Sequence, residues 1–253
     1  MAHECHLAHY IEGMEISGGQ SVGHDSRFAY PDRNEHFVHY GGPSDSATLA
    51  LEAPFVVVDV ETSGLEPHRG ARIIEIAAIK INSKGEVLDS FHTLVNPTNS
   101  DVGMTSIHGV TLDMVQNAPT FGEIADHVKS MLDGAIFVAH HALFDEKFVA
   151  SEFEKSGHDI NTMPGLCTYW LSREIHEKTD EFPNHKLETL TRRYQANPGT
   201  AHSAYSDAMV VAQILPPMLG QFGEVGHYIP ATHQVFSQPN AQVLRPRMLS
   251  LFD

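Results

Sequence analysis

The sequence has few cysteines, few basic residues and no long apolar run. Only Cys5 and Cys167 are present in 253 residues, too few to hold a chain of this size together by disulfides, so a disulfide-rich secreted scaffold is excluded. No stretch approaches the ~18 apolar residues of a membrane-spanning helix, and the first thirty residues lack a basic segment followed by an apolar one. We therefore expect a cytoplasmic protein without a membrane partner.

Basic residues are outnumbered two to one. Lys and Arg total 16 against 32 Asp and Glu, which gives a formal net charge of −16. This balance argues against a long basic surface that binds duplex nucleic acid. Small substrates, strand ends and metal-bridged phosphates remain possible ligands. The 42% of hydrophobic residues is enough for a sizeable core.

The chain divides into three predicted regions. Residues 1–51 carry glycines and several histidines with little apolar periodicity, and we predict a flexible extension. Residues 52–220 contain the apolar patterns of one mixed α/β domain. Residues 221–253 hold few charges and are rich in Pro, Gln and Val, which is typical of a tether.

The pattern in the central region predicts hairpins first and alternating helices and strands later. Three strands in an antiparallel meander are expected at 55–60, 71–81 and 87–95, and a further short strand at 135–139. A strand at 160–163 is also compatible with the sequence. The predicted helices are 112–115, 121–132, 143–155, 167–176, 187–194 and 203–215. Thr120 is the expected cap of the second helix, and Pro216-Pro217 the expected end of the last.

Two acids close the first predicted strand. Because side chains alternate along a strand, Asp59 and Glu61 project from one face, ~6–7 Å apart. Like charges at the end of an apolar strand cost free energy unless a cation lies between them, and a hard divalent ion is the simplest such cation. The alternative is that both acids lie where the strand enters solvent.

Two further acids occur at helix starts. Asp145 follows the strand end at His140-His141, where it either joins a site or favours the helix dipole. His202 and Asp207 open the last helix, and in helical conformation they would lie roughly 140° apart. They share a site only if His202 precedes the helix and Ser203 caps it; otherwise His202 is an ordinary surface histidine.

Taken together, these motifs resemble the DEDDh exonucleases, a family that includes the epsilon proofreading subunit of bacterial DNA polymerase III. The resemblance covers residues 54–219. Its three motifs match 59–64, 141–148 and 202–207, and flanking matches lie at 94–97, 107–111, 118–121 and 186–190. Members often have Asn where His141 stands and Thr where Ser63 stands.

The resemblance implies a ribonuclease H-like α/β fold, with a mixed sheet of an antiparallel three-strand meander plus parallel strands, flanked by helices. It also implies that four acids hold two Mg²⁺ or Mn²⁺ ions: Asp59, Glu61, Asp145 and Asp207. His202 would take the proton from the attacking water, since imidazole titrates near neutrality. Such an enzyme removes nucleoside 5′-monophosphates from 3′ ends, and its cations rather than a basic groove supply the positive field at the phosphate.

The resemblance also implies substrate contacts. Those to the terminal nucleotide are expected from Thr62, Ser63, Gly64 and Leu65, with His108 and Phe144 as neighbours. Phe144 and Phe148 are four residues apart on a helix, so at least one is expected in the core. Tyr169 and Trp170 either stack on bases or, as we expect, pack in the core.

The last residues resemble the short peptide with which bacterial replication proteins bind the sliding clamp. This segment is Met248-Leu249-Ser250-Leu251-Phe252, with Met248 in place of the usual Gln. Its alternative is a terminal segment packed on the domain. Three functions stay open: a DNA 3′-5′ exonuclease in proofreading or repair, an exoribonuclease acting on short RNA or RNA 3′ ends, and a non-catalytic module bound to a polymerase or clamp.

Overall fold

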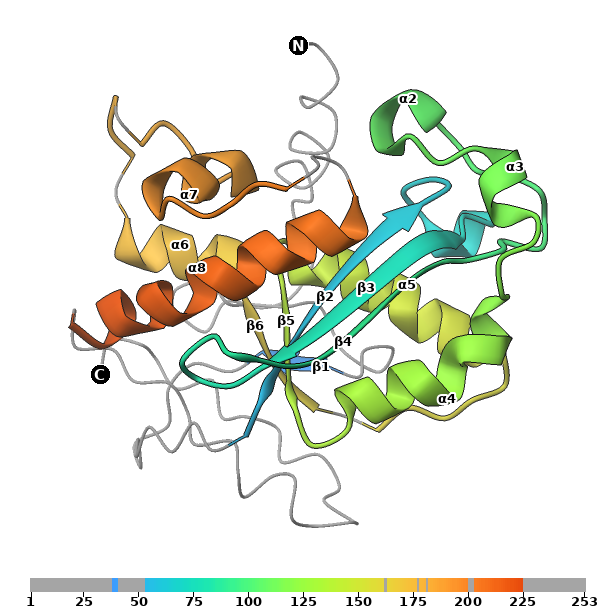
Figure 1. Ribbon diagram of the computed structural model, residues 1–253, viewed down its shortest axis with the longest axis horizontal. Coiled ribbons are helices and arrows are strands. Elements are labelled where there is room, and N and C mark those ends of the chain that lie inside the picture. Colours follow the sequence, from blue (N-terminus) through green and yellow to red (C-terminus); the bar gives the residue numbers. More distant parts are fainter. Residues whose placement is uncertain are drawn as a thin grey trace, which may run out of the picture.

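The computed structural model of the protein describes residues 38–40, 53–161, 163–176, 178–180, 182–199 and 203–224. These residues form a mixed sheet of six strands with helices on both faces (Figure 1). The strands are β1 (Val38–Tyr40), β2 (Phe55–Thr62), β3 (Ile73–Ile81), β4 (Val87–Leu94), β5 (Ile136–Ala139) and β6 (Met163–Cys167). The helices are α2 (Thr105–His108), α3 (Leu112–Val115), α4 (Phe121–Leu132), α5 (Ala142–Lys155), α6 (Thr168–Ile175), α7 (Leu187–Arg193) and α8 (Ala204–Glu224), with a 3-10 turn, η2 (Pro67–Arg69).

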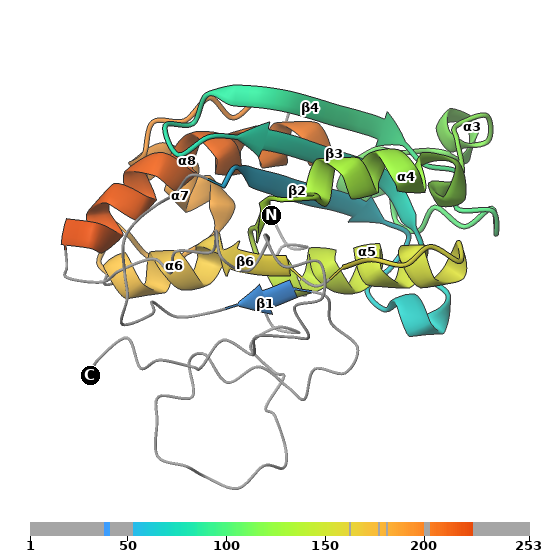
Figure 2. The ribbon, with the colours of Figure 1, turned by 90° about the horizontal axis from the view of Figure 1, so that it is seen from below.

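The sheet has the strand order β1-β6-β5-β2-β3-β4 (Figure 2). The predicted meander is confirmed, because β2, β3 and β4 pair antiparallel in sequence order. β5 pairs parallel with both β2 and β6, and β6 pairs parallel with β1. The predicted mixed sheet is therefore confirmed, and β1 is an additional strand that the sequence pattern did not predict.

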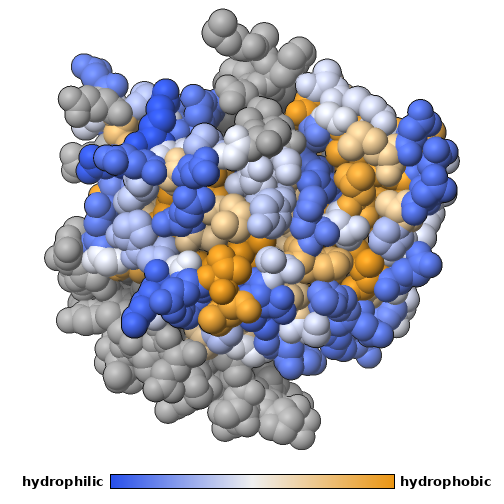
Figure 3. All heavy atoms as spheres, viewed as in Figure 1, coloured by the Kyte–Doolittle hydropathy of each residue, from blue (hydrophilic) through white to orange (hydrophobic). Residues whose placement is uncertain are grey.

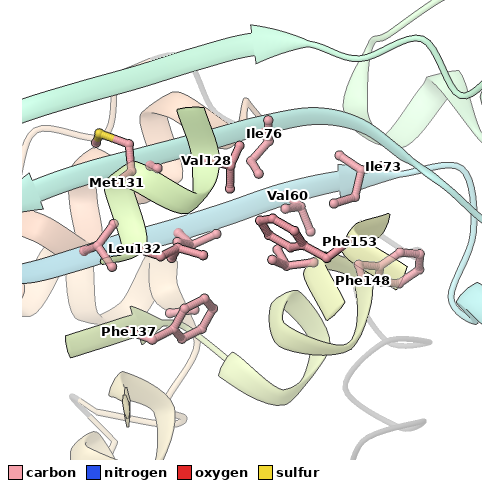
Figure 4. Close-up of a cluster of buried hydrophobic side chains, with 14 of the residues drawn as sticks. Val60, Ile73, Ile76, Val128, Met131, Leu132, Phe137, Phe148 and Phe153 are labelled. Atoms are coloured by element: carbon pink, nitrogen blue, oxygen red, sulfur yellow. The ribbon is translucent and has the colours of Figure 1, made fainter. Parts of the chain in front are cut away.

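One face of the sheet packs on α4 and α5. Valines at every second position of β2 point to this side, where they meet Phe148 and Phe153 of α5 (Figure 4). The α4 prediction is confirmed to the residue, and its start is fixed by a capping box in which the Thr120 N–H donates to Glu123 Oε2 at 2.8 Å. Both Phe side chains are fully buried, so this face forms a continuous apolar core.

The opposite face of the sheet packs on α8, which lies across β2 and β3 (Figure 1). Phe55 and Val57 of β2 point to this side and pack among buried residues of α8, including Val211 and Leu215. Because this helix of 21 residues packs along the sheet, the packing also fixes the position of its first turn, which contains Asp207. The helices α5 on one face and α8 on the other therefore both pack against β2.

The predicted bounds differ most from the structure at the last helix and around β6. The last helix does not end at Pro216-Pro217 but runs on to Glu224. Two prolines remove two backbone donors, but Met218 and Leu219 beyond them are buried in the α8-side core, and this burial offsets the loss. The strand expected at 160–163 lies at 163–167, so Cys167 ends β6 and α6 begins one residue later than predicted.

The two aromatic residues at the start of α6 follow the core interpretation. Tyr169 and Trp170 are half-buried and pack against the α4 and α5 side of the core. Among the described helices, none combines the length and the apolar character that a bilayer crossing requires.

A candidate active site of clustered carboxylates

The end of β2 places two acids on the α8 face of the sheet. Asp59 lies opposite Ala77 of β3, and Glu61 lies opposite Glu75. Residues opposite each other in antiparallel strands share a face, and Ala77 belongs to the core under α8. The period of two therefore carries both carboxylates to the same side, as the sequence predicted.

The third acid comes from the first turn of α8. The Asp207 N–H donates to the Ser203 carbonyl oxygen at 3.0 Å, which is a first bond of this helix. One carboxylate oxygen from each of Asp59, Glu61 and Asp207 lies within 4.8 Å of the others. All three residues are half-buried, so each keeps some contact with solvent. Residues almost 150 positions apart thus meet at one point.

The fourth acid, Asp145, lies in the first turn of α5, as predicted. It is 3% exposed, and its Oδ1 accepts the N–H of Val60, the residue between Asp59 and Glu61, at 3.2 Å. Its negative charge is close enough to raise the pKa of Asp59. Asp145 stands outside the group of three within 4.8 Å but is bonded to the backbone that carries two of them.

Mutual repulsion and burial raise the pKa values of these acids. Burial is the larger cause for Asp59, whose pKa is raised well above its usual range, and the charges of Asp145 and Asp207 add to it. Burial, then Glu75 and Asp207, raise the pKa of Glu61 to about 8. Burial also raises the pKa of Asp145, against the opposite effect of the backbone N–H donors. In the absence of a cation, the group cannot ionise fully at neutral pH.

This arrangement fits a divalent cation. The contributing atoms are carboxylate oxygens, the ligands that Mg²⁺ and Mn²⁺ prefer. A cation among them would remove the repulsion that raises the pKa values, because an opposite charge within a few Å favours the ionised form. Asp59, Glu61 and Asp207 are therefore the residues that would hold it, with Asp145 beside them.

Some predicted site residues lie outside the described residues. His202 is one of them, and so is the whole segment from Met248 to Phe252. The helix α8 begins at Ala204, and the role expected for His202 stays a prediction.

The predicted nucleotide contacts Thr62, Ser63, Gly64 and Leu65 form a bonded turn directly after the acids. Thr62 Oγ1 donates to the Gly64 carbonyl at 2.7 Å, and Ser63 exchanges backbone and side-chain bonds with Arg72. Leu65 is 37% exposed at the end of this turn.

Gly103 allows a second loop to lie against this turn. A Cβ on Gly103 would stand 2.2 Å from the Ser63 carbonyl oxygen, and its φ of +68° also favours glycine. The close approach brings the segment before α2 to the predicted nucleotide contacts. That segment leads directly to His108.

His108 and Phe144 differ in exposure. His108 is 7% exposed, and its Nδ1 accepts the N–H of Val110 at 3.1 Å; burial lowers its pKa, which favours the neutral ring. Phe144 is half-buried, with its ring 5.0 Å from that of Phe148. Phe148 is fully buried, so it is the member of this pair that lies in the core.

His141 occupies a backbone conformation that explains the Asn common in the resembling family. Its φ of 63° and ψ of 45° are left-handed, and Asn adopts this region more readily than most residues. Its ring packs on Tyr169 with centroids 4.1 Å apart, and burial lowers its pKa to about 4. The His141 ring therefore packs on Tyr169 as a neutral imidazole.

Sequence reasoning missed Glu75. This acid lies on β3, 5% exposed, next to the cluster, and its Oε1 is 2.7 Å from His92 Nε2 and 3.3 Å from Ser203 Oγ. The available signal was a single acid inside the otherwise apolar segment 73–79. A lone charge within a buried strand indicates a partner, and the sequence does not reveal which one.

The chain is similar in sequence to known exonucleases. The profile of the exonuclease family RNase_T matches residues 56–215. The DNA polymerase III PolC-type of Caldanaerobacter subterraneus subsp. tengcongensis is 36% identical over 179 residues, which is 70% of this chain and 12% of that protein. The 3′-5′ exonuclease DinG of Bacillus subtilis is 37% identical over 166 residues, 65% of this chain and 17% of that protein. The chain thus matches less than a fifth of the length of either relative.

Solved structures share the fold. Exonuclease X in complex with 5′ overhanging duplex DNA has a TM-score of 0.53 at 23% identity, over 67% of this chain and 93% of that one. E. coli exonuclease I in complex with a dA16 oligonucleotide has a TM-score of 0.58 at 16% identity, over 68% and 42%. A 3′-exonuclease that recognises a histone mRNA stem-loop has a TM-score of 0.55 at 18% identity, over 66% and 82%.

Proposed function

The chain belongs to the DEDDh exonuclease family, and on this premise we propose that it removes nucleoside 5′-monophosphates from DNA 3′ ends by hydrolysis assisted by two divalent cations. The observation that carries the proposal is the meeting of Asp59, Glu61 and Asp207 within 4.8 Å. Acids from two distant elements converge beside Asp145 at considerable electrostatic cost. That cost is relieved by the cations that the reaction requires.

Each acid has a distinct part in this proposal. Asp59, Glu61 and Asp207 hold the cations, and Asp145 completes the ligand set while its Oδ1 fixes the backbone between the first two. Such cations, when bound, supply Lewis-acid stabilisation of the phosphate charge and of the leaving 3′ oxygen. His202 takes the proton of the attacking water as a general base.

Apolar residues beside the acids suit the terminal bases. Leu65 is exposed at the end of the turn after Thr62, and Met104 and Ile107 are 56% and 47% exposed on the segment that Gly103 brings to this turn. Figure 3 views the face that carries α2 and α3, where apolar residues interrupt a mostly hydrophilic surface. Bases have apolar faces, so this surface complements an unpaired 3′ end without a basic groove.

The proposal is tested by degradation of labelled oligonucleotides. Single-stranded DNA and RNA of one sequence, labelled at the 5′ end to show successive shortening, are incubated with the protein in Mg²⁺, Mn²⁺ or EDTA. We expect stepwise shortening of the DNA that needs metal and is lost in His202→Ala. Faster shortening of the RNA would assign the alternative substrate, and no hydrolysis of either would reject the enzyme.

Attachment to the replication machinery forms a separate part of the proposal. We propose that the protein acts in the bacterial cytoplasm near a polymerase, since the two relatives compared are bacterial and one is a polymerase. Residues 248–252 would bind the sliding clamp. Deleting residues 248–253 should abolish capture by immobilised bacterial clamp while oligonucleotide hydrolysis stays unchanged; unchanged capture would reject this attachment.

A further inference from the structure

Glu75 connects three elements through a single carboxylate oxygen. Its Oε1 lies 3.3 Å from the Ser203 hydroxyl, which donates to it, and 2.7 Å from His92 Nε2. Ser203 directly precedes α8, His92 lies on β4, and Glu75 itself lies on β3. The carboxylate therefore ties the start of α8 to β3 and β4, the last two strands of the meander.

The position of Glu75 is electrostatically costly. Glu75 is opposite Glu61 in the sheet, and its charge raises the pKa values of both Glu61 and Asp59. With 5% exposure, it gains little from water. An apolar residue would avoid this repulsion, but the Ser203 hydroxyl would then lose its acceptor.

Ser203 transmits this anchoring to the carboxylate cluster. Its hydroxyl donates to Glu75, and its carbonyl accepts the Asp207 N–H at 3.0 Å. Ser203 also follows His202 directly in sequence. A second contact supports the same turn, because the rings of His92 and Tyr205 lie 5.4 Å apart between centroids.

We propose that Glu75 is a positioning residue that acts through Ser203 to hold the first turn of α8, and with it Asp207, against the end of β2. The inference rests on the proposed function for its kinetic consequence. Glu75 does not touch the substrate in this scheme. Its loss therefore lowers kcat and leaves KM nearly unchanged.

The kinetic test uses one truncation on each side of the bond. Glu75→Ala and Ser203→Ala should each lower kcat by about 10- to 100-fold, because small displacements of reacting groups have effects of this size. Glu75→Gln keeps an acceptor oxygen, and Ser203→Thr keeps the hydroxyl, so both should restore most of kcat. Full kcat in Glu75→Ala, or no rescue by Glu75→Gln, would overturn the proposal.

A double-mutant cycle separates anchoring from ordinary helix capping. If Ser203 acts through Glu75, then Ser203→Ala should have little further effect in the Glu75→Ala background. If Ser203 contributes only as a helix cap, the two losses should multiply, and that result would reject the proposal. Ser90→Ala, on the exposed part of β4, is the matched control and should retain wild-type kcat.

Amide hydrogen exchange gives a readout that does not require activity. Glu75→Ala should speed exchange in the peptide that contains Asp207, relative to wild type and to Ser90→Ala, while exchange in α4 stays unchanged. If the wild type degraded no oligonucleotide, the proposed function would fail, and this measurement would still decide the role of Glu75. Unchanged exchange near Asp207 would refute the anchoring.

Discussion

The two faces of β2 carry different kinds of residue from the same strand. Towards α4 and α5, the strand presents Val56, Val58 and Val60 in sequence, and all three are buried in an apolar core. Towards α8, it starts with Phe55 and Val57 and then changes to acids. The difference shows that one face of β2 is apolar along its whole length and serves the core. The other face changes at Asp59 from core residues to the acids of the site.

The sharpest test of this difference is Asp59→Asn. We expect kcat to fall by ~10³-fold, because ligand loss removes several kcal/mol of transition-state stabilisation. The free energy of unfolding without metal should stay equal or increase, since a repelled carboxylate is removed. Steady-state kinetics and urea unfolding in EDTA measure the two effects. Asp126→Asn, an exposed acid on α4, is the control and should change neither.

The opposite result is expected from Phe153→Ala on the other face. Phe153 is fully buried and packs edge-to-face on Phe121 with centroids 5.2 Å apart. Its truncation should cost about 3–5 kcal/mol of unfolding free energy and leave kcat nearly unchanged at temperatures where the protein stays folded. Leu88→Ala, at an exposed position of β4, is its control. A large loss of kcat in folded Phe153→Ala would show that the faces are not independent.

Metal addition should stabilise the protein through the α8 face alone. A cation that binds only the folded state adds about 2.7 kcal/mol at 100 times its Kd. We therefore expect Mn²⁺ to raise the melting temperature of the wild type and of Phe153→Ala by comparable free energies. Asp59→Asn should respond much less. An equal response of Asp59→Asn would place the bound cation away from the carboxylate cluster.

The smallest expected effect is the pH dependence in EDTA. The pKa of Glu61 is raised from its usual 4.5 to about 8, so between these values the folded state holds a proton that the unfolded state has lost. Stability should therefore fall as pH rises from about 5 to 8, by about 1–2 kcal/mol from this group after allowance for partial exposure. Glu61→Gln should flatten this part of the curve, measured by urea unfolding at fixed ionic strength. An unchanged slope in that variant would contradict the assignment.

The sequence predicted the elements whose causes are local. α4 has its apolar period and its capping box within residues 120–132, and β2 is a short β-branched run. β1 has only three residues and depends on pairing with β6, so no local pattern indicated it. The continuation of α8 past Pro216 likewise depends on contacts with residues distant in sequence.

The candidate site likewise has a part that local sequence predicts and a part that depends on distant contacts. The adjacency of Asp59 and Glu61 on one face follows from the strand period alone. The approach of Asp207 depends on how α8 crosses the sheet, and the resemblance to a family rather than residue spacing supplied it. Glu75 was missed because its role arises from a bond to a residue 128 positions away.

The turn between β3 and β4 lies close to Pro216 in the second half of α8. At Gly85, where φ is +83°, a Cβ would stand 2.9 Å from the ring of Pro216. Pro216 and Asp207 belong to one uninterrupted helix, nine residues or roughly 13 Å apart at 1.5 Å per residue. A side chain added at this hairpin would therefore press on the same helix whose first turn carries Asp207.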